Sequence, residues 1–239
     1  STVEQELAFT FANGIAYMET AVKNGLDPNQ LGQQVSFFFN SHNGFLEEIA
    51  KFRAARKIWS TIMKERFDVT NEKAMMCRFH TQTGGSTLTS EQPENNIVRT
   101  TIQALSAVLG GTQSLHTNSF DEALSLPSNE SAKLALRTQQ IIAHESNITN
   151  HPDPFGGSYI VEEMTDELIK KSFKIISEID SMGGAINAIE SGWIENQIAK
   201  SAYDYQKDID DNKQVVVGVN QFRDENQKDI DLFNINLDS

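Results

Sequence analysis

The sequence predicts an α/β fold in which a few parallel strands are covered by long helices. Short, continuously apolar segments alternate along the chain with long amphipathic segments, as in parallel sheets with helices outside them. The 239 residues are 38% hydrophobic and 22% charged, which is ordinary for a globular protein. Four strands are expected, too few to close an eight-stranded barrel. The chain is therefore either a small open sheet or half of a (β/α)₈ barrel.

The first element is a helix over Val3–Asn24. Leu7, Phe11 and Ile15 recur at helical spacing and mark one apolar face. Gly25 follows at once and suits the left-handed conformation that commonly ends a helix. This segment therefore covers one side of the sheet rather than joining it.

The next two elements are a strand and a long helix. Val35–Phe39 is a short β-branched and aromatic run between polar residues, as expected of a buried strand. In the following segment, 40–67, Phe45, Ile49 and Phe52 lie on one stripe, which predicts an amphipathic helix. Together they form the first strand–helix unit.

The strand–helix alternation then repeats. Ala74–Thr83 is predicted to be the second strand, and Glu94–Leu109 the helix after it. Gly110 and Gly111 end that helix. Thr112–Asn118 is predicted to be the third strand.

Three more helices and a last strand complete the predicted order. The helices are expected over 131–145, 160–182 and 193–211, and the strand over Gln214–Val219. The segment 223–239 is polar and acidic, so it is predicted to be a loosely packed tail. One domain over residues 1–222 and a tail over 223–239 are therefore expected.

Charge and composition exclude several classes of partner and site. The chain has 33 acidic and 20 basic residues, a net charge of −13, and no basic cluster. It is therefore a poor candidate for binding nucleic acid or an anionic membrane surface. No apolar run approaches the ~18 residues of a membrane span, and the first residues lack a signal-peptide pattern. The single cysteine, Cys77, excludes an internal disulfide and favours a reducing, cytoplasmic compartment.

Polar side chains alternate along two of the predicted strands. Because residues two apart share a face of a strand, each strand has one polar row. The rows are Arg78, His80 and Gln82 in one strand, and Ser114, His116 and Asn118 in the other. They reach the carboxyl ends, where parallel sheets and barrels bind ligands, so a polar ligand is expected there. The alternative is that the rows satisfy one another as a structural network or face solvent.

Other chemistries lack support in the sequence. The histidines do not have a metal-binding spacing such as HExxH. Nor does the chain contain a GxSxG elbow, a GxxxxGK[ST] loop or a GxGxxG fingerprint.

Several long motifs nevertheless resemble one family. These are RFHTQTGGSTLTSEQPENNIVRT, GGTQSLHTNSFDEALSLP, FFFNSHNGFLEEIAKFRAARKIW, DPFGGSYIVEEMT and VVVGVNQF. They are similar to the large subunit of the adenosylcobalamin-dependent acyl-CoA mutases, the methylmalonyl-CoA mutase family. The resemblance covers nearly the whole chain and implies the C-terminal half of a TIM-type catalytic barrel.

The resemblance also implies partners that these residues do not supply. The family's Tyr-His pair near the substrate would lie upstream of Ser1, and the DxHxxG motif of its cobalamin-binding domain does not occur here. The expected partners are therefore the N-terminal half of the barrel, a separate or C-terminal cobalamin-binding domain, and an acyl-CoA substrate. The chain alone is expected to be inactive.

Individual site residues follow from matching the family motifs. The resemblance assigns contacts with adenosylcobalamin to His80, Gln82, Asn118 and Glu122. It assigns contacts with the acyl-CoA to Ser36, Phe38, Lys73, Gln113 and Ser114. No residue is assigned a catalytic or metal-ligating role. Each of three residues also has a purely structural interpretation: Glu122 as an acid in the first turn of a helix, favoured by the helix dipole, Lys73 as a solvated surface lysine, and Phe38 as a ring of the apolar core.

The implied activity is a radical carbon-skeleton rearrangement that interconverts branched and linear acyl-CoA thioesters, methylmalonyl-CoA and succinyl-CoA first among them. Gln34 and Ser86 depart from residues common in methylmalonyl-CoA mutases, so isobutyryl- and 2-hydroxyisobutyryl-CoA mutases are alternatives. A non-catalytic half-barrel that binds other proteins is a further alternative. The apolar edges 35–39 and 214–219 further predict self-association into a homo-oligomer.

Overall fold

The computed structural model describes residues 1–224 and contains three parallel strands with helices packed on one face. The helices are α1 (Val3–Lys23), α2 (Pro28–Leu31), α3 (Phe45–Arg66), α4 (Glu72–Met75), α5 (Asn95–Leu109), α6 (Asn129–Glu145), α7 (Tyr159–Ser181), α8 (Ala185–Glu190) and α9 (Trp193–Asp210). The strands are β1 (Phe37–Ser41), β2 (Phe79–Thr83) and β3 (Ser114–His116), and short 3₁₀ turns cover Gly85–Thr87 and Ile148–Asn150.

The sheet has the order β1-β2-β3, and both neighbouring pairs are parallel. Phe38 lies opposite His80, and His80 lies opposite Ser114. The prediction of parallel pairing is therefore confirmed, and the three strands lie side by side in chain order. The coarser prediction of an α/β fold with outer helices also holds.

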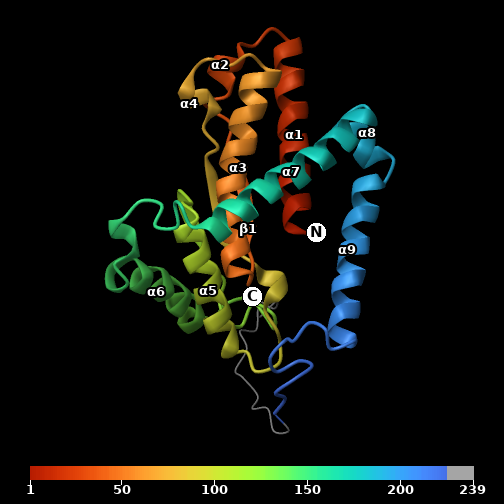
Figure 1. Ribbon diagram of the computed structural model, residues 1–239. Coiled ribbons are helices and arrows are strands. Elements are labelled where there is room, and N and C mark those ends of the chain that lie inside the picture. The colour runs from red at the N-terminus through yellow and green to blue at the C-terminus, as the bar shows by residue number, and fades with distance from the viewer. Residues whose placement is uncertain (225–239) are drawn as a thin grey trace, which may run out of the picture.

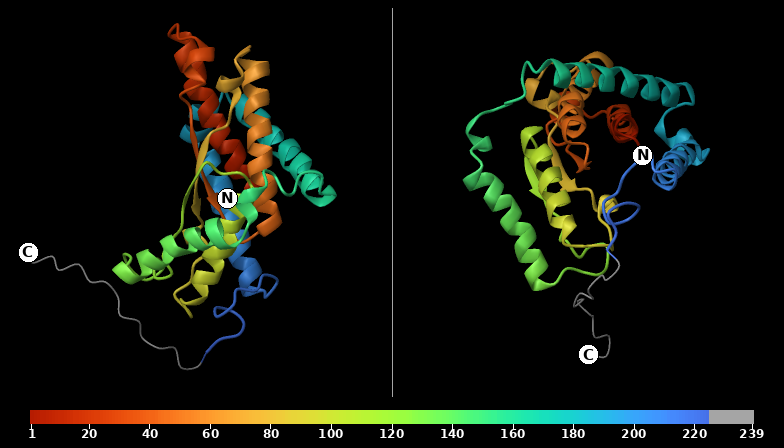
Figure 2. Two further views of the ribbon diagram at one scale, coloured as in Figure 1. Left: turned by 90° about the vertical axis from the view of Figure 1, so that its left-hand side faces the viewer. Right: turned by 60° about the horizontal axis from the view of Figure 1, so that its bottom comes forward.

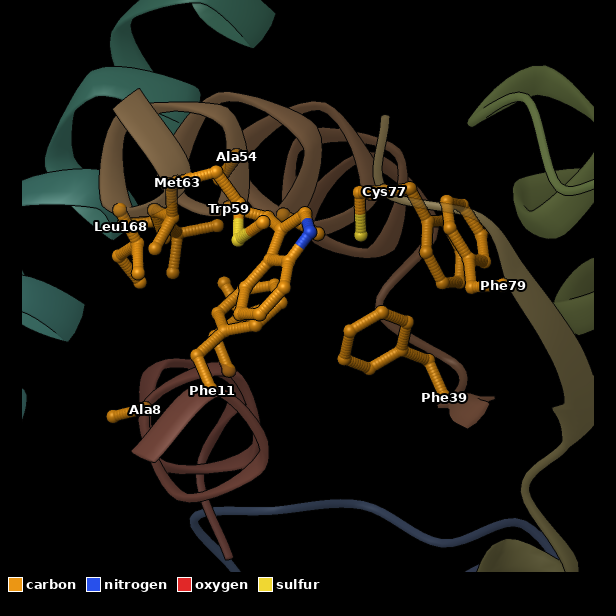
Figure 3. Packing of buried hydrophobic residues seen from close by; sticks show 14 of the residues in the cluster. Ala8, Phe11, Phe39, Ala54, Trp59, Met63, Cys77, Phe79 and Leu168 are labelled. Carbon is orange, nitrogen blue, oxygen red and sulfur yellow. The ribbon is translucent and has the colours of Figure 1, made fainter. Parts of the chain in front are cut away.

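The apolar core lies between the sheet and α1, α3 and α7. Phe39 and Phe79 point from the strands into this layer, where the Phe79 ring stacks on Phe52 of α3 with centroids 5.3 Å apart. Trp59 of α3 stacks on Phe11 of α1 with centroids 5.7 Å apart (Figure 3). Helix α7 crosses α1 and α3 on the side away from the sheet (Figure 1). The helix-covered face of the sheet is thus closed by aromatic packing.

Helix α9 extends beyond this core. It contacts α8 and stands apart from α3 and α5, as Figure 1 and the right-hand view of Figure 2 show. Although α9 is amphipathic, none of its residues is buried. Among the described helices, none is long and apolar enough to cross a membrane.

The predicted fourth strand is wrong. Residues 214–219 form turns, and Val217 makes only an isolated bridge with Gln221. Gly218, with φ of +85°, reverses the chain in the middle of the apolar run, so the run cannot extend as a strand. Arg99 donates to the Val217 carbonyl at 2.7 Å and fastens the turn to the start of α5. The predicted edge at 214–219, one basis for expecting self-association, is therefore not formed.

Two other boundaries shift. The second strand begins at Phe79 rather than Ala74, because Glu72–Met75 forms a helical turn that the Asn71 side chain caps by accepting from the Lys73 N–H. The first strand runs to Ser41, two residues beyond its predicted end. Most of the predicted tail, from residue 225 on, lies outside the described residues.

Candidate functional site

The open face of the sheet has a row of side chains across all three strands. Phe38, His80 and Ser114 are directly opposite one another in register. The His80 Nδ1 lies 2.7 Å from the Ser114 hydroxyl, and the Phe38 ring centroid lies 5.3 Å from that of His80. Phe38 is 52% exposed, so it is not a core residue. A flat aromatic and hydrogen-bonding surface therefore faces away from the helices.

A second group lies at the carboxyl ends of β2 and β3. The Gln82 amide donates to Asn118 Oδ1 at 2.9 Å, and Asn118 Nδ2 donates to the Thr83 carbonyl at 2.9 Å. The Asn118 N–H donates to the Thr83 hydroxyl at 2.8 Å. Asn118 is buried and held by three bonds, so its position is fixed before any ligand arrives.

Glu122 lies beside Asn118, across from a diglycine turn. A Cβ on Gly85 would lie 2.8 Å from Glu122 Oε1 and 3.0 Å from Asn118 Nδ2, so a side chain there would displace Glu122. Burial raises the pKa of Glu122, with Asp121 adding to the effect and His116 opposing it. The structure thus brings together all four residues assigned to the cofactor: His80 and Gln82 on one strand, Asn118 and Glu122 after the next.

Residues assigned to the acyl-CoA are spread over the opposite end of the sheet. Ser36 is exposed and precedes β1 on the same face as Phe38, while Lys73 is exposed on α4. Gln113 accepts from the Phe79 N–H at 2.7 Å and donates to the Gly111 carbonyl at 3.2 Å. The Gln113 amide is therefore already engaged in joining the amino ends of β2 and β3. Of this set, Ser114 and Phe38 contact the cofactor group, both through His80.

Some polar side chains of the two rows hydrogen-bond to one another, as expected if the rows form a structural network. His80 bonds to Ser114 and Gln82 bonds to Asn118, each across neighbouring strands. This face of the sheet is nevertheless accessible to a ligand, because it exposes Phe38, Asn40, Ser114 and His116. Arg78, the first member of its row, donates instead to the carbonyls of Gly32, Gln33 and Val35 and fixes the loop before β1.

A buried charged group at the carboxyl end of β1 was missed by the sequence reasoning. The Lys51 amine is fully buried and lies 2.8 Å from Glu6 Oε2 and 2.5 Å from Glu48 Oε2. We call these three residues the carboxylate–lysine cluster. Glu48 and Lys51 fall inside the apolar stripe of α3, three residues apart, and this was the signal that could have revealed them.

The cluster has an unusual balance of charge. Burial raises the pKa of Glu48 to about 7, against the opposing influence of Lys51. Lys51 has its pKa raised by Glu6 and Glu48, although burial acts the other way. One cation therefore faces two carboxyl groups, and burial favours the state in which Glu48 keeps its proton. Burial and the nearby Lys51 lower the pKa of His42, which adjoins the cluster.

No group of three or more His, Cys, Asp or Glu side chains within residues 1–224 is arranged to hold a metal ion. The site consists instead of uncharged hydrogen-bonding groups, one carboxyl and aromatic rings on an open sheet face. Such groups can hold sugar hydroxyls, amides and flat rings by hydrogen bonding and stacking.

Comparisons with known proteins show the family to which the chain belongs. The family model described as "Methylmalonyl-CoA mutase" matches residues 1–239. The chain is 48% identical over 230 residues to a probable mitochondrial methylmalonyl-CoA mutase of Caenorhabditis elegans, covering 96% of this chain and 31% of that protein. It is 49% identical over 228 residues to the 2-hydroxyisobutanoyl-CoA mutase large subunit of Aquincola tertiaricarbonis, covering 95% of this chain and 40% of that protein.

A third relative is the methylmalonyl-CoA mutase of Rhizobium meliloti, 45% identical over 235 residues, with 98% of this chain and 33% of that protein covered. The chain thus spans between about a third and two-fifths of the length of these relatives. Because the family model covers all 239 residues, the chain belongs to the methylmalonyl-CoA mutase family.

Proposed function

We propose that the chain is part of the catalytic barrel of an adenosylcobalamin-dependent acyl-CoA mutase, and that it supplies the C-terminal half of that barrel. The observation that supports this proposal is the group of Gln82, Asn118 and Glu122 at the carboxyl ends of parallel strands, with His80 two residues earlier on the same face. This is the end at which barrels bind ligands.

The residues present fit the cofactor. When bound, adenosylcobalamin would supply the radical that starts the rearrangement, and the protein would supply binding and orientation. Glu122 offers carboxyl oxygens, and Asn118 Oδ1, which accepts from Gln82, can accept a second bond, so the pair suits ribose hydroxyls. Gly85 places no side chain next to Glu122 Oε1 and Asn118 Nδ2. His80 and Gln82 offer hydrogen-bond donors and acceptors at the half-buried face of the sheet, suited to amide side chains.

The acyl-CoA would lie along the same face toward the amino ends. Ser36, Phe38 and Ser114 would contact the acyl and pantetheine portions, and the exposed Lys73 amine would meet a phosphate. Gln113 would bind the substrate only by giving up its bonds to Phe79 and Gly111, so its part is to hold Ser114 in place.

The substrate we propose is the methylmalonyl-CoA and succinyl-CoA pair. The identities of 48% to a methylmalonyl-CoA mutase and 49% to a 2-hydroxyisobutanoyl-CoA mutase favour neither acyl group, so the latter and isobutyryl-CoA are the alternatives. The relative named as a large subunit is consistent with an enzyme of several subunits. A separate or C-terminal cobalamin-binding domain, the N-terminal barrel half, assembly as a homo-oligomer and a cytoplasmic location belong to this proposal.

The test is binding and turnover by the purified chain. We expect it to bind adenosylcobalamin, measured by equilibrium dialysis, and Asn118→Ala to weaken that binding about tenfold or more, since a preplaced acceptor is lost. Arg137→Gln, an exposed change on α6, is the control. Isomerisation of methylmalonyl-CoA by the chain with adenosylcobalamin alone would refute the proposal that it is one component. Unchanged binding in Asn118→Ala would refute the assigned cofactor site.

A further inference from the structure

The carboxylate–lysine cluster holds the main chain at the carboxyl end of β1. Glu6 Oε1 accepts from the Asn40 N–H at 2.8 Å, and Lys51 Nζ donates to the Asn40 carbonyl at 2.6 Å. The Glu48 carboxyl interacts with the His42 N–H, an interaction that acts to lower the pKa of Glu48. Asn40 is therefore held by two hydrogen bonds, and His42 by its contact with Glu48, through side chains that Lys51 keeps in place.

His42, fixed in this way, lies against the diglycine turn that follows β2. A Cβ on Gly84 would overlap His42 Nδ1 and lie 2.9 Å from Cε1 of the ring. The Gly84 N–H donates to the Ser41 carbonyl at 2.7 Å, between the fixed residues Asn40 and His42. The position of Gly84 therefore depends on where the β1 end lies.

Gly85, the second residue of the turn, lies against Asn118 and Glu122, where a Cβ would come within 3.0 Å of both. Close contacts thus run without a break from Lys51 through Glu48 and His42 to the diglycine turn, and from there to Asn118. Because these groups are packed without spare room, a displacement at one end is passed to the next group.

We propose that Lys51 is a positioning residue for Asn118 and Glu122: through Glu6 and Glu48 it fixes His42, and the His42 ring sets the place of the diglycine turn beside that pair. The identification of Asn118 and Glu122 as a cofactor site rests on the proposed function. The positioning itself concerns this chain's own residues and can be measured without a ligand.

The test compares two hydrogen bonds at opposite ends of the same strand pair, by amide hydrogen exchange of the full 239-residue chain. The Gly84 N–H bonds to Ser41 at the carboxyl end, and the Phe37 N–H bonds to the Arg78 carbonyl at 2.8 Å at the amino end. In Lys51→Met, exchange at Gly84 is expected to accelerate about tenfold more than at Phe37. Equal acceleration at both amides would overturn the proposal, because the cluster would then add only general stability.

The control variant lies on the same helix. Met63 is fully buried on α3, twelve residues or about 18 Å from Lys51 along the helix. Met63→Ala is expected to lower overall stability while leaving the ratio of Gly84 to Phe37 exchange unchanged. A raised ratio in Met63→Ala would count against a specific role for Lys51.

Two variants of Glu48 keep the proposal testable if Lys51→Met does not fold. Glu48→Gln retains an oxygen for the His42 N–H and is expected to keep the wild-type ratio. Glu48→Ala removes that acceptor and is expected to raise the ratio about tenfold. The same ratio in both variants would overturn the proposal.

A ligand measurement separates this inference from the proposed function. Dialysis of adenosylcobalamin against the chain is expected to give about tenfold weaker binding in Glu48→Ala and unchanged binding in Glu48→Gln. If the wild-type chain binds no adenosylcobalamin, the proposed cofactor is wrong, while the exchange ratio still decides whether Lys51 positions the turn. If wild type and Glu48→Ala bind equally, the positioning does not reach Asn118 and Glu122.

Discussion

The buried carboxyl of Glu48 makes the stability of the chain depend on pH. Its pKa is about 7 in the folded chain, against 4.5 for the free group. Because the folded value is the higher one, the stabilising contribution is complete below pH 4.5 and is lost as the pH rises through about 7. The difference corresponds to about 3 kcal/mol, most of which falls between about pH 5 and pH 8.

The perturbation that isolates this effect is Glu48→Gln, which keeps the shape of the side chain and cannot ionise. Urea unfolding of wild type and variant is measured at several values between about pH 5 and pH 8. The free energy of unfolding of the variant, minus that of wild type, is expected to grow by about 2–3 kcal/mol over this range.

The matched control is Glu47→Gln, the same chemical change on the exposed side of the helix. It is expected to stay within about 0.5 kcal/mol of wild type throughout. If the difference for Glu48→Gln is constant within about 0.5 kcal/mol across the range, Glu48 does not hold its proton in the folded chain. The account of one buried cation facing two carboxyl groups would then be wrong.

Three further predictions concern the site, the core and the thiol. Gly85→Ala places a Cβ 2.8 Å from Glu122 Oε1, so adenosylcobalamin binding measured by dialysis should weaken about tenfold, whereas Arg137→Gln, at an exposed position of α6, should leave it unchanged. Phe52→Ala, at a fully buried position, should lower the free energy of unfolding in urea by about 3–5 kcal/mol; a loss below about 1 kcal/mol would contradict the packing described. Burial raises the pKa of Cys77 to about 12, so iodoacetamide should label it at about pH 8 only after unfolding, and rapid labelling of the native chain would show that the thiol is accessible.

The long helices and the first three strands could be predicted because each has both the local residue pattern of its element and an apolar face that packs against the rest of the fold. The stripe of Leu7, Phe11 and Ile15, for example, meets the aromatic layer of α3 as its spacing indicates. The run at 214–219 has only the local residue pattern of a strand. Its valines favour a strand, but Gly218 and the hydrogen bond from Arg99 to Val217 make a turn, and only the folded chain reveals that contact.

The candidate site was predictable at its carboxyl end and less so elsewhere. Strand alternation placed His80 and Gln82 on one open face, and the parallel register brought them to Ser114 and Asn118. The engagement of Gln113 by backbone groups depends on the distance between neighbouring strand ends, which a sequence does not give. The carboxylate–lysine cluster was missed because Glu6 is 45 residues from Lys51 along the chain.

The cluster has a consequence for what can join the outer edge of β1. Phe37 and Ser41 use their backbone groups toward β2, so those of Ser36, Phe38, Asn40 and His42 point the other way. Side chains already bind the backbone of Asn40, and the Glu48 carboxylate binds the His42 N–H. A segment that pairs with this edge must therefore align with Ser36 and Phe38 and turn away before Asn40. So short a ladder gives little main-chain affinity, and side-chain packing around Phe38 decides which segment can bind.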